Sequence, residues 1–427
     1  MKISRSVGSG VSAMVAGAVL MALAAAPAAA QGSLPFEQAL KAAATAAASE
    51  TAAAETTAAE TTAAGEPQAA AAAENPVLTF FKGTELMGFV DTYYAYNFNK
   101  PNSPCQTVGG VAMVNCLHNF DFTHNSFSLN LAELALEKKP TMDSRGGYRV
   151  DLDYGPTTAW VHGFEPGGVG VFQNVQQAYL SYLAPAGKGT LQLDFGKFVT
   201  WNGNEVIETK DNWNYTRSLL FTLAIPYYHT GVRAAYSPND KVTLTGFLVN
   251  GWNNSVDNNT GKTVGVSVTG KPTGAFTIIA NYTGGPETTS DNTGWRQLFD
   301  VTASYTANKQ ASVAVNYDAG KDQNSNQAWQ GVAVYLKYQG NDWFAVVPRY
   351  EFLKDKDGFM TGMSQNMQEF TLTAEFKHKD GVMMRVEYRG DFSNLNGGYF
   401  LKGTGELVKG QNSLTVGWVY AFSSKTP

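Results

Sequence analysis

The sequence predicts an all-β protein: a transmembrane antiparallel β-barrel of about 16 strands (14–18), preceded by a signal peptide and a low-complexity tether. From Glu85 onward, apolar and polar residues alternate with a period of two, as in residues 148–154 and 382–389. This period is typical of strands with one apolar and one polar face. Aromatic residues gather at strand ends, for example in residues 418–422, where barrels carry aromatic girdles at the membrane interfaces.

The composition excludes three classes of protein. Only 16% of the 427 residues are charged, against roughly 25% in soluble globular domains, so the chain is poor in charge. A membrane protein with several spanning helices is excluded, because outside the N-terminus no apolar run approaches the ~20 residues of such a helix. The 24 Phe, 20 Tyr and 8 Trp are too many for a highly charged disordered chain. The formal net charge of −5 argues against nucleic-acid binding.

The N-terminal residues are expected to be an export signal and a spacer. Residues 1–30 combine the basic Lys2 and Arg5 with an apolar stretch and a small-residue cleavage site. A single membrane anchor is the alternative, disfavoured because the apolar stretch is short and rich in Ala. Residues 31–76, rich in Ala, Thr and Glu, cannot build a core and are interpreted as a flexible tether. The barrel should occupy residues 77–427.

The two cysteines, Cys105 and Cys116, lie in a stretch rich in Pro, Asn and Gly. Because an exported protein meets an oxidising compartment, we expect a disulfide that closes this loop, with free thiols as the alternative. His118 alone cannot complete a zinc site with them.

Alternating segments recur along the whole body, separated by turns such as Asn-Thr-Gly at residues 259–261. The alternation slips phase between Leu131 and Leu134, where a β-bulge would return Glu133 to the polar face. The strands are expected to begin near residues 85, 124, 147, 174, 189, 228, 241, 262, 275, 296, 310, 329, 342, 367, 381 and 411.

Two architectures accommodate many alternating strands. A soluble sandwich buries the apolar face between two sheets, whereas a membrane barrel turns it to lipid and keeps the polar face inside. Several charges share one face of a strand, as Arg385, Glu387 and Arg389 do. A sandwich would have to solvate that face and also bury an aromatic rim, so the barrel is favoured. The chain continues past Phe422 with a polar tail, whereas membrane barrels commonly end on an aromatic residue.

Six stretches carry a resemblance to a known family: residues 88–98, 124–130, 177–185, 195–233, 249–252 and 261–264. The first three read GFVDTYYAYNF, HNSFSLN and QAYLSYLAP. On these residues the sequence resembles the OmpL-like β-barrel porins, the porin-2 type. The resemblance implies an outer-membrane pore, with no catalytic residue to transfer and no particular solute.

Residues 201–227 are the longest interruption of the strand pattern before the C-terminal half, charged at first and apolar from Leu219 to Ile225. Since a wide barrel leaves an aqueous lumen, our hypothesis is that this segment folds inward and narrows it, facing arginines across the eyelet in a transverse field. An external loop or an extended strand pair is an equal alternative. The candidate pore-lining and constriction residues are Glu205, Glu208, Lys210, Asp211, Arg217, Arg149, Asp151, Asp153, Asp194, Arg233, Arg349, Glu351, Arg385, Glu387 and Arg389.

Inward-facing acids suggest a binding site for a cationic solute, although such residues more commonly wet the lumen and pair with arginines. These acids are Asp151, Asp153, Asp194, Glu133 and Glu351. We expect no resident metal and no cofactor. Asp355 and Asp357 lack the rest of an EF-hand loop, and Gly261-Lys262-Thr263 lacks the first glycine of a phosphate-binding loop.

The expected function is passive diffusion of small hydrophilic solutes or ions across a Gram-negative-type outer membrane, without enzymatic activity. Expected partners are outer-membrane lipid, the solutes and the assembly machinery, but not nucleic acid; a homo-oligomer stays open. One alternative is a loop-blocked barrel used for adhesion or as a structural protein. Another is a lipid-modifying barrel enzyme built on Ser126 and His124, for which no third orienting group is apparent.

Overall fold

The computed structural model describes residues 76–163, 165, 170 and 172–425. The expected signal peptide, residues 1–30, and the expected tether up to residue 75 lie outside the described residues. Among the described residues, no helix is long and apolar enough to cross a membrane.

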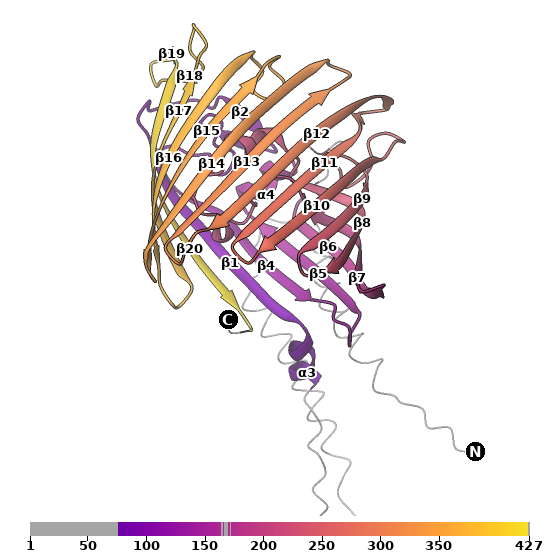
Figure 1. The fold of residues 1–427 in the computed structure, drawn as a ribbon. Coiled ribbons are helices and arrows are strands. Elements are labelled where there is room, and N and C mark those ends of the chain that lie inside the picture. Colours follow the sequence, from indigo (N-terminus) through magenta and orange to yellow (C-terminus); the bar gives the residue numbers. More distant parts are fainter. Residues whose placement is uncertain (1–75, 164, 166–169, 171, 426–427) are drawn as a thin grey trace, which may run out of the picture. The chain divides into compact units, whose positions relative to one another are not determined.

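Sixteen strands close into one antiparallel barrel, in which β1 completes the ring by pairing with β20 (Figure 1). The predicted strand number is therefore confirmed. The barrel strands are β1 (Glu85–Asn97), β4 (Ser126–Lys138), β5 (Gly146–Tyr154), β6 (Val175–Ala186), β7 (Gly189–Val199), β8 (Tyr228–Asn239), β9 (Val242–Val249), β10 (Thr263–Thr273), β11 (Phe276–Thr288), β12 (Asp291–Thr306), β13 (Ala311–Asp322), β14 (Gln327–Asn341), β15 (Phe344–Asp355), β16 (Gln365–Lys377), β17 (Val382–Ser393) and β20 (Gly410–Ser423).

Short elements occupy the N-terminal side and the connections. Two hairpins, each a separate two-stranded sheet, interrupt the β1–β4 and β17–β20 connections. These short elements are α3 (Pro76–Gly83), β2 (Gln106–Val108), β3 (Val111–Met113), α4 (Pro156–Val161), β18 (Phe400–Leu401) and β19 (Leu407–Val408).

The predicted β-bulge is present where β4 pairs with β1. Asp91 pairs with Leu131, whereas the next residue, Thr92, pairs with Leu129, so the intervening residue of β4 has no partner. Beyond the bulge, Glu133 is buried and Leu134 is exposed. One inserted residue thus keeps the carboxylate on the inner face and the leucine on the outer face.

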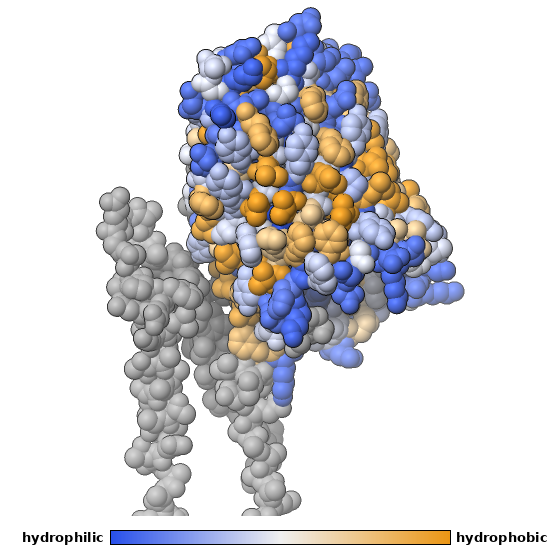
Figure 2. Space-filling model, turned by 90° about the vertical axis from the view of Figure 1, so that its left-hand side faces the viewer, coloured by the Kyte–Doolittle hydropathy of each residue, from blue (hydrophilic) through white to orange (hydrophobic). Residues whose placement is uncertain are grey.

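The outer face of the barrel is apolar. Large hydrophobic side chains stay exposed along the strands, and Figure 2 shows them gathered in a band across the middle of one face, between more hydrophilic ends. An exposed apolar surface of this extent is unfavourable in water but matches the hydrocarbon layer of a membrane. Examples are Phe127, Leu180, Phe195, Leu248, Val266, Leu336 and Trp418.

The inner face carries the charged residues. On β16 and β17 most of the residues that alternate with this apolar surface are buried and polar or charged, as the patterns of Gln365–Lys377 and Val382–Ser393 show. Buried charges need partners, and these partners come largely from one long connection.

Candidate functional site

The connection between β7 and β8, residues 200–227, runs through the interior of the ring; we call it the inner segment. It contains two short helical turns, η1 (Thr209–Asp211) and η2 (Leu220–Ala224). Although it leaves β7 and returns at β8, η1 contacts β20 while η2 contacts β13 and β14, five or more strands away around the ring. The inner segment also bonds to inward-facing side chains in the middle of β15 and β17.

Arg349 on β15 joins the wall to the inner segment. Its side chain is fully buried, and Nε lies 3.0 Å from Oε2 of Glu369 on the neighbouring strand β16. Nη1 donates to Oε1 of Glu205 at 2.9 Å and to the carbonyl oxygen of Thr216 at 2.6 Å, both in the inner segment. The planar guanidinium can serve all three acceptors because its N–H donors are fixed in a fork.

Two arginines of β17 bind the backbone of the inner segment in the same way. Nη1 of Arg385 donates to the carbonyl oxygen of Thr209 at 2.7 Å, while its Nε donates to Glu375 at 2.9 Å. Nη1 of Arg389 donates to the carbonyl oxygen of Arg217 at 2.7 Å. Both side chains are buried, so they act as anchors and do not face open solvent.

Carboxylates of the same wall accept backbone N–H groups of the inner segment. Glu387 on β17 accepts from Tyr215 at 2.7 Å. Glu351 on β15 accepts from Leu219 at 2.9 Å and from Leu220 at 3.2 Å, at the start of η2. The free N–H groups at the start of a helical turn favour a negatively charged acceptor.

Wall glycines leave room for two large side chains of the inner segment. A Cβ atom on Gly331 of β14 would lie 2.4 Å from Cδ2 of Leu220, and one on Gly417 of β20 would lie 2.2 Å from the ring of Tyr215. The Tyr215 hydroxyl donates to Asp91 of β1 at 2.8 Å. Burial and the Asp91 carboxylate raise the pKa of Tyr215 well above its ordinary value, so it stays a hydrogen-bond donor.

The apolar half of the inner segment packs on β12 to β15. Leu220 and Phe221 belong to one buried cluster with Leu298 and Trp329 of the wall. The Trp329 indole N–H also donates to the carbonyl oxygen of Ala224 at 3.2 Å. Apolar packing and a buried hydrogen bond thus hold this half against the barrel.

The opposite wall keeps its charges partly open to solvent. On β5, Arg149 is 26% exposed, with Nε 2.9 Å from Oδ2 of Asp151. On β8, Arg233 is 24% exposed, with Nε 2.7 Å from Oδ2 of Asp194 on β7. These arginines pair with acids of their own wall and not with the inner segment.

The candidate residues therefore form three groups. Glu205, Arg217, Arg349, Glu351, Arg385, Glu387 and Arg389 are buried where the inner segment meets the wall. Arg149, Asp151, Asp194 and Arg233 form pairs on β5, β7 and β8. In the third group, Glu208 and Asp153 are buried near Glu133, whereas Lys210 pairs with the more exposed Asp211 at 2.5 Å. The expected transverse field does not describe the first group, because Glu205 contacts Arg349 directly.

Sequence reasoning missed a second inward connection, residues 98–125 between β1 and β4, which we call the disulfide loop. Asn119 donates to the carbonyl oxygen of Thr222 in the inner segment at 3.0 Å. The rings of Phe120 and Phe221 lie 5.7 Å apart, and the Arg217 guanidinium lies 4.8 Å from the Phe120 ring centre. The dense run of apolar and aromatic residues at 116–122 was the available signal for burial.

A disulfide joins Cys105 to Cys116, with Cα atoms 5.8 Å apart. The carbonyl oxygen of Cys116 also accepts from Nε2 of Gln411 on β20 at 2.6 Å. The cross-link therefore restricts a loop that is itself bonded to the inner face of the barrel.

His118 of the disulfide loop bridges two carboxylates. Nδ1 lies 2.5 Å from Oδ2 of Asp121, and Nε2 lies 2.9 Å from Oδ2 of Asp391 on β17. Burial alone would lower the pKa of His118, and Arg389 opposes protonation as well, but the two carboxylates outweigh both and raise the pKa.

Ser126 and His124, the candidate pair for a lipid-modifying enzyme, are hydrogen-bonded to other groups. Nδ1 of His124 accepts the N–H of Asn97 at 2.9 Å, and the Ser126 hydroxyl donates to the carbonyl oxygen of Phe127 at 3.4 Å. In a catalytic pair the nucleophile is hydrogen-bonded to its base. Ser126 and His124 are not arranged in this way.

Comparison with solved structures finds the same fold at low sequence identity. The anion-selective porin from Comamonas acidovorans gives a TM-score of 0.53 at 11% identity, covering 79% of this chain and 99% of that one. OmpF of Salmonella typhi in complex with daunomycin gives 0.51 at 14% identity, with coverages of 79% and 97%. The outer-membrane channel DcaP of Acinetobacter baumannii gives 0.50 at 13% identity, also with 79% and 97%.

No curated protein matches the chain. The family model described as "Putative beta-barrel porin-2, OmpL-like" matches residues 83–422, nearly the whole of the barrel, in agreement with the resemblance noted from the sequence. The protein lies in the bacterial outer membrane. It shares the family's barrel fold, and it has an apolar belt outside and a polar interior. The chain belongs to the OmpL-like β-barrel porin-2 family.

Proposed function

We propose that the protein lets small hydrophilic solutes or ions diffuse passively through the barrel, and that the inner segment narrows the path. The observation that carries the proposal is the contrast between the arginines of the two walls. Arg349, Arg385 and Arg389 bind it to β15 and β17, while Arg149 and Arg233 on the opposite wall keep solvent-exposed surface.

The size of the ring supports an aqueous path. Barrels of 16–18 strands leave room for a channel, whereas the interior of an eight-stranded barrel is filled by side chains. Partly exposed guanidinium groups on the inner face need water around them. We therefore place the path along β5 to β8, on the side away from the anchored part of the inner segment.

The charges along this path would set the ion preference. The partly exposed cations are Arg149, Arg233 and Lys210, the first two paired with acids that are themselves buried. Asp211 is 54% exposed and offers the opposite charge beside Lys210. Charged rings and patches of this kind govern selectivity in pores.

A loop-blocked barrel with an adhesive or structural role is the second candidate. The disulfide loop favours it, because it also enters the interior and bonds to the inner segment through Asn119 and Thr222. Each connection that enters the ring leaves less space for solutes.

Recordings from purified protein in planar lipid bilayers separate the two candidates. A pore gives discrete, ohmic current steps, and a salt gradient then gives the sign of its ion preference from the reversal potential. Silent membranes, with protein shown to be folded by its heat-modifiable migration on gels, would support the blocked barrel.

Membrane lipid, assembly machinery and a homo-oligomer remain proposed partners. The apolar belt suits lipid along the whole ring. Native mass spectrometry in detergent measures the number of copies directly.

A further inference from the structure

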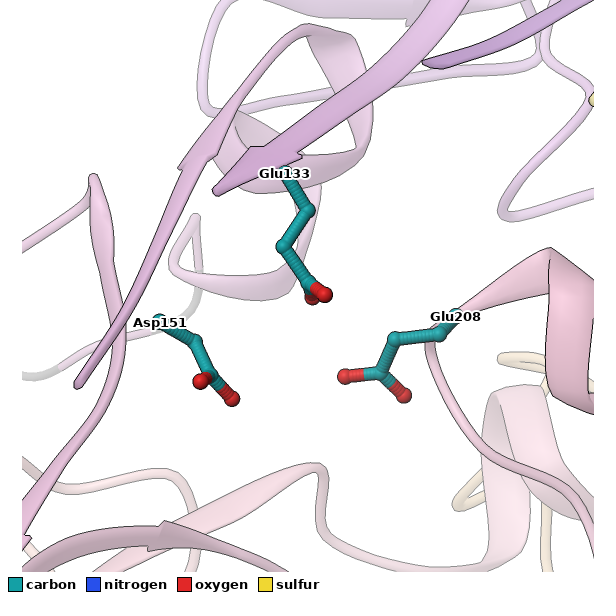
Figure 3. A group of neighbouring side chains, drawn as sticks. All are labelled: Glu133, Asp151 and Glu208. Carbon is teal, nitrogen blue, oxygen red and sulfur yellow. The ribbon is translucent and has the colours of Figure 1, made fainter. Parts of the chain in front are cut away.

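Three carboxylates from three separate elements converge inside the barrel. Glu133 comes from β4, Asp151 from β5 and Glu208 from the inner segment, just before η1, and their side chains point toward one another (Figure 3). One oxygen of each lies within 4.8 Å of the others, and all three residues are buried. We call this group the acidic cluster.

Unpartnered carboxylate oxygens lie against the acidic cluster. Asp153 is 0% exposed, and apart from the neighbouring carboxyl group of Glu133 its oxygens have no hydrogen-bond partner among the described residues. It pairs directly with Glu133 across the β4–β5 ladder, so both side chains lie on the inner face and adjacent. Oε2 of Glu133, a residue that is 6% exposed, is unpartnered as well. Buried acceptors without donors are costly unless something else satisfies them.

The nearby cations neutralise this charge only in part. The group holds four carboxylates, counting Asp153. Arg149 binds Asp151 through Nε, at 3.0 and 2.9 Å, and Lys210 is held by Asp211 at 2.5 Å. Lys197 bonds to the imidazole of His162 at 2.6 Å and to a backbone carbonyl. Burial, and to a smaller extent the charge of Asp151, raises the pKa of Glu208.

We propose that the acidic cluster binds a divalent cation, Ca²⁺, which links the inner segment to the wall at β4 and β5. Ca²⁺ takes carboxylate oxygens at about 2.3–2.6 Å, so two of its ligands lie at most about 5.2 Å apart. The three oxygens, all within 4.8 Å of one another, satisfy this limit.

The donor set selects the class of cation. The acidic cluster offers oxygen atoms alone, which suits Ca²⁺, Mg²⁺ or Mn²⁺ and not the metals that prefer nitrogen or sulfur. Mg²⁺ demands shorter bonds and strict octahedral geometry, whereas Ca²⁺ tolerates irregular ligands from separate elements. Carboxylates that can bind through both oxygens, with water, would complete its coordination.

From its location, the cation would stabilise the position of the inner segment. The arginines anchor the inner segment to β15 and β17, on one side of the ring. At Glu208 the same segment approaches β4 and β5. In the ring, β1 and β20 separate these two strands from β17. A cation there fixes the segment at a second place, and this inference does not depend on the protein being a conducting pore.

Calorimetry on the intact protein tests the site. The protein is purified in detergent, stripped with EDTA, dialysed at pH 7.5 and titrated with CaCl₂, and separately with MgCl₂. We expect one Ca²⁺ site with a Kd at or below about 1 mM, and weaker Mg²⁺ binding. Glu208→Gln should weaken Ca²⁺ binding at least tenfold. The matched control is Glu406→Gln, an exposed residue that pairs with Lys402 far from the cluster in sequence, which should keep the Kd within threefold.

Thermal unfolding of the wild type tests Ca²⁺ binding without depending on whether any variant folds. Ca²⁺ should raise the midpoint and EDTA should lower it, since a ligand that binds the folded state stabilises it. If Glu208→Gln does not fold, Asp153→Asn takes its place in the titration. Absence of Ca²⁺ heat and of stabilisation in the wild type would overturn the proposal. Unchanged Ca²⁺ affinity in folded Glu208→Gln would overturn it too.

Discussion

The Glu387 carboxylate on β17 accepts the backbone N–H of Tyr215 at 2.7 Å, so one wall side chain fixes the backbone of the inner segment near its midpoint. Its other oxygen accepts the N–H of Thr216 at 2.9 Å. Both oxygens are therefore needed as acceptors, and an amide side chain offers only one.

Glu387→Gln is therefore expected to destabilise the protein although the side chain keeps its size. An unsatisfied buried N–H costs about 1–3 kcal/mol, and the thermal midpoint measured by circular dichroism in detergent should fall. Glu406→Gln makes the same chemical change at an exposed site and should leave the midpoint unchanged. Equal midpoints for both variants would contradict this role of Glu387.

Gly417→Ala is expected to displace Tyr215. The new Cβ would lie 2.2 Å from the tyrosine ring, so the ring must move and its 2.8 Å hydrogen bond to Asp91 must break. Overpacking of this kind costs about 1–3 kcal/mol. Gly246→Ala on β9 is the control, because nothing lies within 4 Å of its Cβ position. Urea midpoints of the two variants should differ, and a match between them would refute the close approach of Tyr215 to β20.

Arg349→Met is expected to be the most damaging single change at the anchored wall. It leaves Glu205 and Glu369 buried without their guanidinium partner, and breaking a buried ion pair in this way costs about 3–5 kcal/mol. Adding Glu205→Gln to Arg349→Met should recover part of the loss, because one uncompensated charge is removed. Chemical unfolding of both variants measures the recovery; strictly additive losses would argue against the contact.

The His118 bridge predicts a stability that falls as the pH rises. Asp121 and Asp391 raise the pKa of His118 in the folded protein above its unfolded value, against the opposing charge of Arg389. Its contribution is therefore complete below the unfolded pKa of about 6.5 and is lost as the pH rises through the folded pKa. The difference in unfolding midpoint between wild type and His118→Asn, followed from pH 5 to 10, should shrink at high pH. A difference that is independent of pH would contradict the bridge.

Most of the barrel could be predicted because each strand shows its two faces in its own residues. The alternation located the strands, and the slip near Leu131 and Leu134 located a bulge, since a single inserted residue must reverse the pattern. A closed ring then follows from burying polar groups inside and exposing apolar ones to lipid.

The candidate site could be predicted only in part. Charge composition distinguished residues 201–227 from a strand, but nothing local in Glu208 indicates that it meets Glu133 and Asp151 from two strands far away in the sequence. Likewise, the sequence shows Arg349 and Glu205 as candidate charges on opposite sides of an eyelet, whereas the fold brings them into contact at 2.9 Å. Such contacts depend on the conformation of long loops inside the barrel, which the alternation of residues along the strands does not determine.

Single-channel conductance of the wild type and of a variant lacking residues 203–216 tests the central claim most directly. The deletion removes η1, Glu205, Glu208 and Tyr215, and with them the contacts of the inner segment with Asp91 of β1 and with Arg385 and Glu387 of β17. Both proteins are recorded in planar bilayers at the same salt concentration, after heat-modifiable migration has shown that each is folded. The account predicts discrete steps for the wild type and larger ones for the deletion. An unchanged conductance, with the variant folded, would contradict it.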